Sequence, residues 1–253
     1  MIKLSDITLA FGHRELIAHA STEFTRGNLI ALLGRNGTGK STLLRAIAAL
    51  GSVQGGTIEI DGRPIGTLSP TELARNIAFV NTERIEVESM TAYELVAIGR
   101  SPYTDWMGRL TDDDHTIINK SMRMASVESL ANRKVDTLSD GECQRVMIAR
   151  ALAQQTPIIL LDEPTAFLDL PNRYELCTLL ATLAHTSNRC IIFSTHELDI
   201  ALTLADSIAL VDTPHLTHLP TEDMIASGNI ERLFLGNNVH FDTKSRSIRF
   251  KRE

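Results

Sequence analysis

The chain has 253 residues, of which 43% are hydrophobic and 22% are charged, and 31 acidic against 25 basic residues give a formal net charge of −6. These values are typical of a globular protein and exclude a disordered or fibrous chain. The acidic balance also argues against a nucleic-acid-binding protein, so no nucleic-acid partner is expected. The three cysteines are widely spaced without a C-x-x-C pair, which favours a reducing compartment over a disulfide framework or a zinc site.

No segment reaches the run of about 18 apolar residues that a membrane-spanning helix needs. The first residues, 1–6, include an acid where a secretory signal peptide would have its apolar core. We therefore expect a cytosolic chain. If the protein works at a membrane, a partner must hold it there.

The beginning of the chain predicts two kinds of strand. Residues 2–11 and 21–24 mix apolar and polar residues, which is typical of antiparallel strands with one solvated face. Residues 29–33 are continuously apolar, which indicates a strand buried on both faces, as in a parallel sheet.

A phosphate-binding motif follows this buried strand. Residues 34–41 read GRNGTGKS, which fits G-x-x-x-x-G-K-[ST], and they open an amphipathic run over residues 41–50. Glycines let the backbone N–H groups converge, and the helix start adds partial positive charge, so an anion of phosphate size is favoured there. The alternative is an ordinary glycine-rich turn between a strand and a helix. The candidate phosphate-binding residues are Gly34, Asn36, Gly37, Thr38, Gly39, Lys40, Ser41 and Thr42.

Two residues of this motif have distinct expected roles. Lys40 would reach the β- and γ-phosphates of a nucleotide, and the hydroxyl of Ser41 would ligate Mg²⁺. A nucleotide with β- and γ-phosphates and Mg²⁺ are therefore expected, and the family resemblance described below implies that the cofactors are ATP and Mg²⁺.

The middle of the chain predicts helices. Ser69 is followed by Pro and, three residues on, by Glu72, and Thr111 is followed by three aspartates, so both positions are candidate helix starts. A short strand is expected at residues 77–80, but no buried strand is visible from about residue 83 to residue 155. We expect a helical subdomain over about residues 84–155, inserted into an α/β core.

Three further apolar runs, at residues 158–161, 190–193 and 208–211, are separated by segments of helix length. This alternation predicts a doubly wound α/β fold with a parallel sheet. The last residues, 239–251, predict a hairpin whose basic side chains protect an edge strand from aggregation. Without linkers or repeats, the chain is expected to form one domain over residues 1–253.

Two acids follow the run at residues 158–161. Asp162 and Glu163 lie at the carboxyl end of a predicted buried strand, which is where open parallel sheets bind ligands. Because successive residues of an extended chain point to different sides, Asp162 is expected to hold the metal and Glu163 to act as the base for an attacking water. The alternative is a pair of surface acids, but a carboxylate with apolar neighbours needs a partner or a metal.

Residues 138–144, which read LSDGECQ, begin a helix rich in arginine and aliphatic residues. Together with the two motifs above, they resemble the ATP-binding cassette family over essentially the whole chain. The resemblance implies an ATPase with a P-loop NTPase core, an N-terminal antiparallel β-subdomain and an inserted helical subdomain. It also implies a homodimer on ATP binding, in which Ser139 and Gly141 of one copy face the nucleotide of the other. The capping box formed by Ser139 and Glu142 supports a helix start that presents N–H groups to a phosphate.

The same resemblance assigns further roles. Phe11 would stack on adenine, Asp169 would lie in the loop that crosses the dimer, and His196 would contact the γ-phosphate. Two departures stand out: Asp140 and Glu142 add negative charge to the signature loop, and Thr82 stands where the family has a glutamine that contacts the metal.

Residues 90–105 resemble the subfamily that imports iron-siderophores, haem and cobalamin. This branch implies a peripheral subunit at the cytoplasmic face of the inner membrane, with permease subunits as partners and, indirectly, a substrate-binding protein. Tyr103 and Trp106 would then line a groove for a permease helix, whereas otherwise they are ordinary surface residues. Two rival functions stay open: a cassette ATPase that powers another transport or assembly process, and a nucleotide-gated regulatory module.

Overall fold

The computed structural model describes residues 1–81, 89–234 and 238–250. The first part of the chain contributes to a four-stranded antiparallel sheet with strand order β2-β1-β4-β5. Its members are β1 (Ile2–Phe11), β2 (Arg14–Phe24), β4 (Gly55–Ile60) and β5 (Arg63–Pro64). The expected antiparallel strands are therefore confirmed, while β4 and β5 were not predicted.

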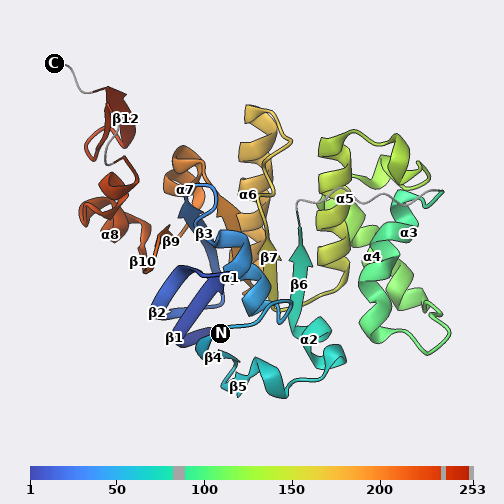
Figure 1. Ribbon diagram of the computed structural model, residues 1–253. Helices are drawn as coiled ribbons and strands as arrows, with labels where there is room; N and C mark the ends of the chain where they lie inside the picture. Colours follow the sequence, from blue (N-terminus) through green and yellow to red (C-terminus); the bar gives the residue numbers. More distant parts are fainter. Residues whose placement is uncertain (82–88, 235–237, 251–253) are drawn as a thin grey trace.

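A six-stranded sheet occupies the middle of the molecule (Figure 1), with strand order β10-β9-β3-β8-β7-β6. All neighbouring pairs are parallel except β9 with β10. The strands are β3 (Asn28–Gly34), β6 (Ile77–Val80), β7 (Ile158–Leu161), β8 (Cys190–Thr195), β9 (Ser207–Asp212) and β10 (His215–Pro220). This arrangement confirms the α/β fold class, and the four apolar runs predicted as parallel strands all lie in this sheet.

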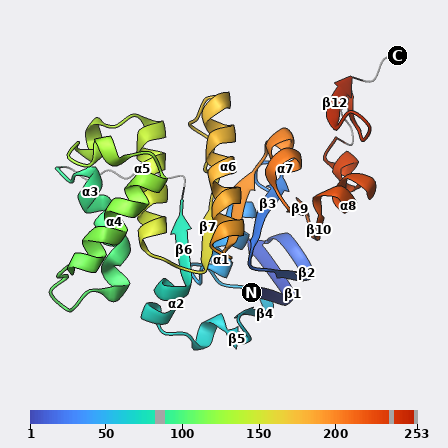
Figure 2. The ribbon, with the colours of Figure 1, turned by 180° about the vertical axis from the view of Figure 1, so that it is seen from behind.

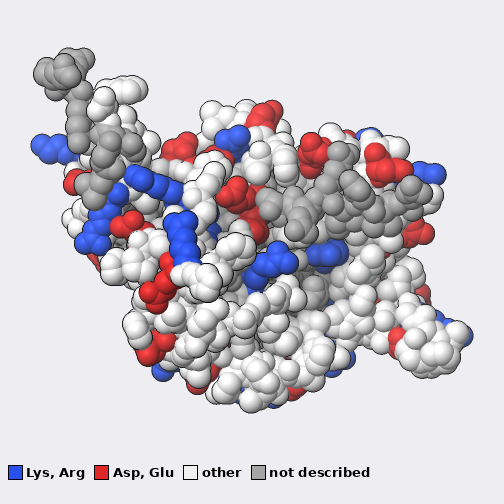
Figure 3. Space-filling model, viewed as in Figure 1, with Lys and Arg blue, Asp and Glu red and all other residues white. Residues whose placement is uncertain are grey.

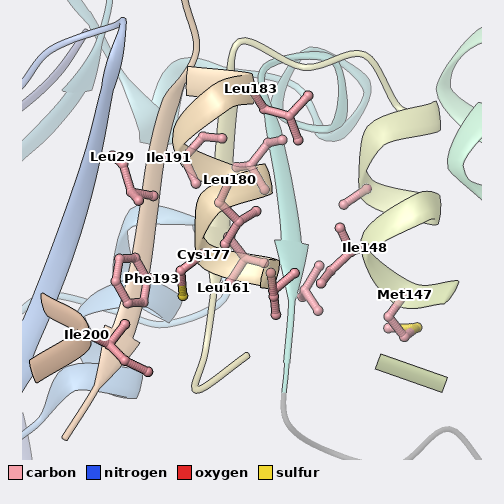
Figure 4. Packing of buried hydrophobic residues seen from close by; sticks show 14 of the residues in the cluster. Leu29, Met147, Ile148, Leu161, Cys177, Leu180, Leu183, Ile191, Phe193 and Ile200 are labelled. Atoms are coloured by element: carbon pink, nitrogen blue, oxygen red, sulfur yellow. The ribbon is translucent and has the colours of Figure 1, made fainter. Parts of the chain in front are cut away.

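Alternate residues of the central strands supply two separate cores. On β3, Leu29, Ala31 and Leu33 belong to one buried cluster, and Ile30 and Leu32 belong to the other. The first cluster packs against α5 (Asp140–Ala153), α6 (Leu170–Thr186) and α7 (Leu198–Leu204), and Figure 4 shows part of it. The second packs against α1 (Lys40–Ile47) and the antiparallel sheet. Because both faces are covered, the strands read as continuous apolar runs.

Between β6 and β7 the described chain is helical. These helices lie beyond β6, the edge strand of the sheet, in both Figure 1 and Figure 2. They are α3 (Ala92–Ala97), the 3-10 helix η2 (Ile98–Tyr103), α4 (Asp112–Met124), the 3-10 helices η3 (Glu128–Leu130) and η4 (Val135–Thr137), and α5. The 3-10 helix η1 (Ile65–Thr67) and α2 (Pro70–Asn76) precede β6. The boundaries of a separate subdomain stay a prediction.

The predicted helix starts are confirmed at atomic detail. Ser69, Thr111 and Ser139 are each the N-cap of a helix, and each forms a full capping box with the residue three positions later. Such reciprocal bonds satisfy backbone donors that a helix start otherwise leaves free, and they fix where α2, α4 and α5 begin.

The segment 99–103 is anchored to the rest of the molecule by its buried residue Arg100. Arg100 is buried and donates from Nε to Asp114 Oδ1 at 2.7 Å and from Nη1 to the carbonyl of Ala153 at 2.9 Å. Its guanidinium also lies 4.1 Å from the centroid of the Tyr103 ring, and the Tyr103 hydroxyl donates to the carbonyl of Gln154 at 3.0 Å. Tyr103 therefore braces η2 against the end of α5, whereas Trp106 is 92% exposed.

The chain ends on the side of the molecule opposite the helices that follow β6 (Figures 1 and 2). Its elements are α8 (Thr221–Ala226), the 3-10 helix η5 (Asn229–Phe234), β11 (Val239–Asp242) and β12 (Ser247–Phe250). β11 and β12 pair as the predicted hairpin. Acidic and basic side chains are interspersed over the face seen in Figure 3. Within the described residues, no helix combines the length and apolar character that crossing a membrane requires.

Candidate functional site

The loop between β3 and α1 forms a backbone cradle. Gly39 has φ of 104°, and a Cβ placed on it would lie 2.9 Å from the Cβ of Leu16, so only glycine fits without a shift. No side chain of the described residues caps the start of α1. The first N–H groups of this helix are therefore available to an anion, which the helix dipole also favours.

Lys40, the first residue of α1, is a buried cation with 5% of its surface exposed. Its Nζ donates to the carbonyls of Gly34 at 2.9 Å and Arg35 at 3.1 Å, and it lies 3.8 Å from Glu163 Oε1. Burial lowers the pKa of Lys40, and the nearby charges of Glu163 and Asp162 oppose that shift. Its charge is thus incompletely compensated within the chain, and a negatively charged ligand would stabilise it.

Sheet order brings the other predicted groups to the same edge. β3, β8 and β7 are neighbours and parallel, so the loops that follow them lie side by side. His196 follows β8, and its Nδ1 lies 3.6 Å from Glu163 Oε1. The Glu163 carboxylate thus lies within 4 Å of both the Lys40 ammonium and the His196 ring.

The two acids diverge for a reason that differs from the expected one. Glu163 does not continue an extended strand but has φ of 42°, in the left-handed region. Ser194 holds this turn: its hydroxyl donates to Asp162 Oδ1 at 2.6 Å and accepts the Glu163 N–H at 2.8 Å. Asp162 stays buried with 6% exposure, while Glu163 turns toward the cavity beside Lys40. Ser194 was not predicted, although it lies two residues before His196.

A cavity of about 500 Å³ is lined by half of the predicted residues. One side is formed by the loop and α1, with Asn36, Gly37, Gly39, Lys40, Ser41 and Thr42. The other side is formed by Phe11, Arg14, Leu16 and Glu163. The ring of Phe11 is 79% exposed, so it offers an open apolar face at the cavity. Arg14 and Leu16 were missed by sequence reasoning; the pairing of Arg14 with Phe11 across the β1–β2 turn is what brings Arg14 there.

The oxygen atoms at this cavity could bind a hard cation whose remaining ligands come from outside the protein. Ser41 and Glu163 line the cavity, and Asp162 is the direct neighbour of Glu163. In the part of the chain that the structure describes, no group of three or more His, Cys, Asp or Glu side chains could hold a metal. Few protein oxygens, with the remaining positions left to phosphate and water, are what Mg²⁺ uses at nucleotide sites.

Seven predicted residues are outside the described lining of this cavity, and one is not described. Gly34, Thr38, Asp162 and His196 belong to the same loops as lining residues or to the neighbouring strand end. Ser139 caps α5, Gly141 follows in its first turn, and Asp169 caps α6 by accepting the Asn172 N–H at 3.1 Å. Thr82 falls outside the described residues.

The added charge of Glu142 in the signature loop is partly offset. Its Oε1 accepts from Arg133 at 2.9 Å, and its Oε2 accepts the Ser139 N–H at 2.8 Å. The hydrogen bond from the Ser139 backbone, helped by the Ser139 hydroxyl and Arg133, holds the pKa of Glu142 below its usual value.

Comparison with known proteins finds a matching family and similar sequences. A sequence model described as ABC transporter matches residues 17–166. The chain is 41% identical to the ABC transporter ATP-binding protein MJ0873 of Methanocaldococcus jannaschii over 83% of this chain and 73% of that protein. It is 36% identical to the achromobactin transport ATP-binding protein CbrD of Dickeya dadantii, covering 81% and 77%. It is 40% identical to the hemin import ATP-binding protein HmuV of Nocardia farcinica, covering 79% and 68%.

Solved structures agree with the sequence relatives. A metal-chelate type ABC transporter in an inward-facing conformation matches with a TM-score of 0.80 and 26% identity over 92% of this chain and 88% of that one. The dimeric structure of MJ0796, a bacterial ABC transporter cassette, matches with a TM-score of 0.76 and 27% identity over 87% and 99%.

Proposed function

Because the chain belongs to the ABC transporter family, we propose that it is the ATP-hydrolysing subunit of an importer for an iron-siderophore, haem or cobalamin-type compound. The observation that carries this proposal is the cavity in which Lys40 and Glu163 face one another above the glycine-rich loop. The substrate class rests on relatives named for achromobactin transport and hemin import. The transported compound itself does not contact this chain.

The binding of ATP follows from the walls of the cavity. Phe11 would stack on the adenine, and the residues of the loop, Gly34 to Thr42, would bind the phosphates through backbone N–H groups, with the Thr38 hydroxyl bonded to the Arg35 carbonyl at 2.9 Å. Lys40 would donate to the β- and γ-phosphates in place of its present carbonyl partners. Ser41 and Asp162 would hold Mg²⁺, and Thr82 is the third predicted contact to the metal. The bound metal would neutralise phosphate charge.

Glu163 is the proposed general base. Its carboxylate lies within 4 Å of Lys40 and His196, which would both contact the γ-phosphate, so it is placed to accept the proton of a water that attacks the γ-phosphorus. His196 would contact the γ-phosphate from the next strand end. Ser194 positions both acids, because its single hydroxyl bonds to the Asp162 carboxylate and to the Glu163 N–H. The chemical step then depends on positioning and on electrostatic stabilisation.

A second copy of the chain would complete the site. Ser139 and Gly141 lie at the start of α5, outside the cavity of their own chain, and the dipole of α5 would favour a phosphate from another chain. ATP would close a homodimer because each nucleotide is contacted by the loop of one copy and by Ser139 and Gly141 of the other. Asp169 would lie in the loop that crosses between them. The dimeric MJ0796 cassette, which shares this fold, supports this arrangement.

The membrane partner would be a permease that receives substrate from a binding protein. Trp106 is 92% exposed and Met107 is 53% exposed at the loop after η2, which supports this loop as the docking surface. Tyr103 would brace that loop through Arg100 and Gln154. The subunit would then be peripheral at the cytoplasmic face of the membrane.

The change Glu163→Gln tests the ATPase assignment. ATP turnover should fall by roughly 10²- to 10⁴-fold while ATP binding persists, because the amide keeps the shape but cannot accept a proton. The control is Glu128→Gln, a carboxylate that is 63% exposed on η3, which should leave turnover unchanged. Turnover of the Glu163→Gln protein at the parent rate would contradict the base assignment.

Purification from membranes distinguishes import from other cassette functions. The chain should copurify with a membrane permease, and Trp106→Ala should weaken that association, while Phe250→Ala, which removes a 79% exposed aromatic at the other end of the molecule, should not. Copurification with no membrane protein would favour a nucleotide-gated regulatory module.

A further inference from the structure

A small cavity of about 80 Å³ lies where α4, α5 and the turn between α6 and β8 meet. The turn, residues 187–189, directly precedes β8, so the cavity lies at the edge of the parallel sheet where its strands begin. The residues of the proposed ATP site follow the opposite ends of the same strands. This cavity is therefore separate from the nucleotide cavity, and the ATPase mechanism does not use it.

Every polar side chain of the described cavity lining can donate a hydrogen bond, and none of them is a carboxylate. Apart from a lysine at the rim, these donors are the Arg189 guanidinium, the Ser121 and Ser187 hydroxyls and the Gln155 amide. Ser121 is only 4% exposed. Arg100 Nη1 donates to Gln155 Oε1 at 3.0 Å, which leaves Nε2 of the same amide as a donor. The described lining thus offers several donors without supplying a negative charge.

Arg189 has a guanidinium nitrogen without a partner. Its Nη1 is buried, and no described residue accepts a hydrogen bond from it. Burial lowers the pKa of the Arg189 guanidinium, and Tyr103 opposes that shift. The backbone is fixed on both sides, because the Arg189 N–H donates to the Ala184 carbonyl at 3.0 Å and its carbonyl accepts the Gly27 N–H at 2.9 Å. A buried donor without an acceptor costs free energy, so a ligand that accepts from it would stabilise the folded chain.

The carboxyl ends of α4, α5 and α6 lie at this cavity, and their partial negative charge favours cations there. These helix ends account for the presence of a cation but do not satisfy it. The carbonyls of Ser121, Leu152 and Leu183, in the last turns of the three helices, each accept a backbone N–H. The unpartnered nitrogen of Arg189 therefore needs an acceptor from outside the described chain.

We propose that this cavity binds a free tetrahedral oxyanion, such as inorganic phosphate, on the Arg189 guanidinium. One water needs roughly 10–15 Å³, so a cavity of about 80 Å³ has room for several waters or for one such ion. The planar guanidinium can donate two parallel hydrogen bonds to one ion, and Gln155 and Ser121 can donate to its other oxygens. Lys120, exposed at the rim, adds positive potential without being needed for the contact.

The bound ion would link α4 and the end of α5 to the turn before β8. It would therefore stabilise the position of the helices that follow β6 relative to the parallel sheet. This site goes beyond the proposed function and does not depend on it.

Calorimetric titration of inorganic phosphate into the Lys40→Met protein tests the site, because this change weakens the competing phosphate site of the glycine-rich loop. In this background, Arg189→Met should raise the phosphate dissociation constant by at least about 10-fold, since it removes the charged hydrogen bonds. Arg189→Lys should restore only part of the affinity, because an ammonium lacks the planar fork. Arg123→Met, which removes a 68% exposed guanidinium of α4 outside the cavity lining, should change nothing. An unchanged dissociation constant for Arg189→Met would overturn the proposal.

Thermal unfolding separates loss of the ion from loss of the fold. At ten times its dissociation constant, phosphate should raise the melting temperature of the Lys40→Met protein by about 3–6 °C. The same phosphate concentration should leave the melting temperature of the Arg189→Met variant unchanged. If phosphate raised both melting temperatures equally, or if Arg189→Met melted well below its parent without phosphate, the guanidinium would not be the unsatisfied anion-binding group that we propose.

Two further measurements identify the source and the place of the oxyanion. Glycerol 3-phosphate should bind at least about 10-fold more weakly than inorganic phosphate, because the small cavity leaves no room for the ester. Equal or tighter binding would overturn the assignment of a free ion and would favour the phosphate group of a larger molecule. Crystals soaked in tungstate should show an ion within hydrogen-bond distance of Arg189. An ion found only at the glycine-rich loop would overturn the site.

Discussion

Lys40 and Arg100 are both buried cations, each with 5% of its surface exposed, but their surroundings differ. Arg100 donates to the Asp114 carboxylate at 2.7 Å and also to the Ala153 carbonyl and the Gln155 amide oxygen. Within the described residues, Lys40 donates to two loop carbonyls alone, and the carboxylate of its described ion pair is 3.8 Å away.

The difference separates a cation that supports the fold from one that is available to a ligand. Arg100 is neutralised within the chain and ties η2 to α4 and α5, whereas burial lowers the pKa of Lys40 because its compensation is incomplete. Both residues follow a glycine in a short motif, so the sequence alone does not reveal the distinction. The hydrogen-bond and ionic partners of each buried cation reveal the distinction.

Removing the Arg100 guanidinium should have the largest effect on the free energy of unfolding. Arg100→Met should lower the free energy of unfolding by about 3–5 kcal/mol, because it leaves the Asp114 carboxylate buried without its cation. Urea unfolding measures this loss. Arg75→Met is the control, because its exposed guanidinium lies 5.3 Å from the same Tyr103 ring and should contribute less than about 1 kcal/mol. Equal losses in both proteins would contradict the comparison.

Removing the Lys40 charge should affect turnover and leave the fold intact. Lys40→Met should reduce ATP turnover by about 10²- to 10³-fold, since it removes a donor to the transferred phosphate. The free energy of unfolding without nucleotide should not fall, because the buried charge is incompletely compensated. Lys120→Met, on the exposed face of α4, should change neither quantity. A strongly destabilised Lys40→Met protein would show that Lys40 is structural.

Asp114, the carboxylate that pairs with Arg100, gives a second test of how this buried ion pair stabilises the fold. The Thr111 N–H, with further help from the Thr111 hydroxyl and Arg100, lowers the pKa of Asp114 from 3.8 to about 2. Asp114→Asn should therefore lower the free energy of unfolding at neutral pH by roughly 1–3 kcal/mol. In the parent, this contribution is present above pH 3.8 and is lost as the pH falls toward about 2.

Acid unfolding of the two proteins checks this assignment. The stability difference between parent and Asp114→Asn should shrink over that acidic window, because the parent carboxylate becomes protonated there. A difference that stays constant down to pH 2 would mean that the charge of Asp114 is not what stabilises this contact.

The smallest predicted effect is the pH dependence of ATP affinity. A bound triphosphate would raise the lowered pKa of Lys40, so binding takes up a proton once the pH exceeds the pKa of the free protein. Affinity should then fall by up to about tenfold per pH unit at alkaline pH. Titration of the parent and Lys40→Met proteins measures this slope. The same slope in both would exclude Lys40 as its source.

Local patterns were sufficient to predict much of the fold. Continuous apolar runs predicted the parallel strands because both faces of the sheet are covered. Cap residues followed by acids in the first turn predicted the starts of α2, α4 and α5, because the capping bonds span only three residues. β4 and β10 were not predicted. β4 begins with two glycines, and the side chains of β10 are only half-buried or exposed, so neither strand has a continuous apolar run.

The sequence predicted those site residues that belong to one motif. The prediction was incomplete where segments that are distant in the sequence meet. Arg14 and Leu16 reach the cavity through the pairing of β2 with β1, and Ser194 reaches Asp162 because β8 lies beside β7. The docking role of Tyr103 stays a prediction, and its hydrogen bond to the carbonyl of Gln154, 51 residues away, was not predicted. Such long-range partners leave no signal in local spacing.

The central claim is that the charge of Lys40 is available to a triphosphate that joins two copies of the chain. Light scattering of the protein with Mg²⁺ and a non-hydrolysable ATP analogue tests it most directly. The account predicts the mass of two chains with the analogue, and of one chain without it or with Lys40→Met. A parent protein that binds the analogue to saturation and keeps the mass of a single chain would contradict the account.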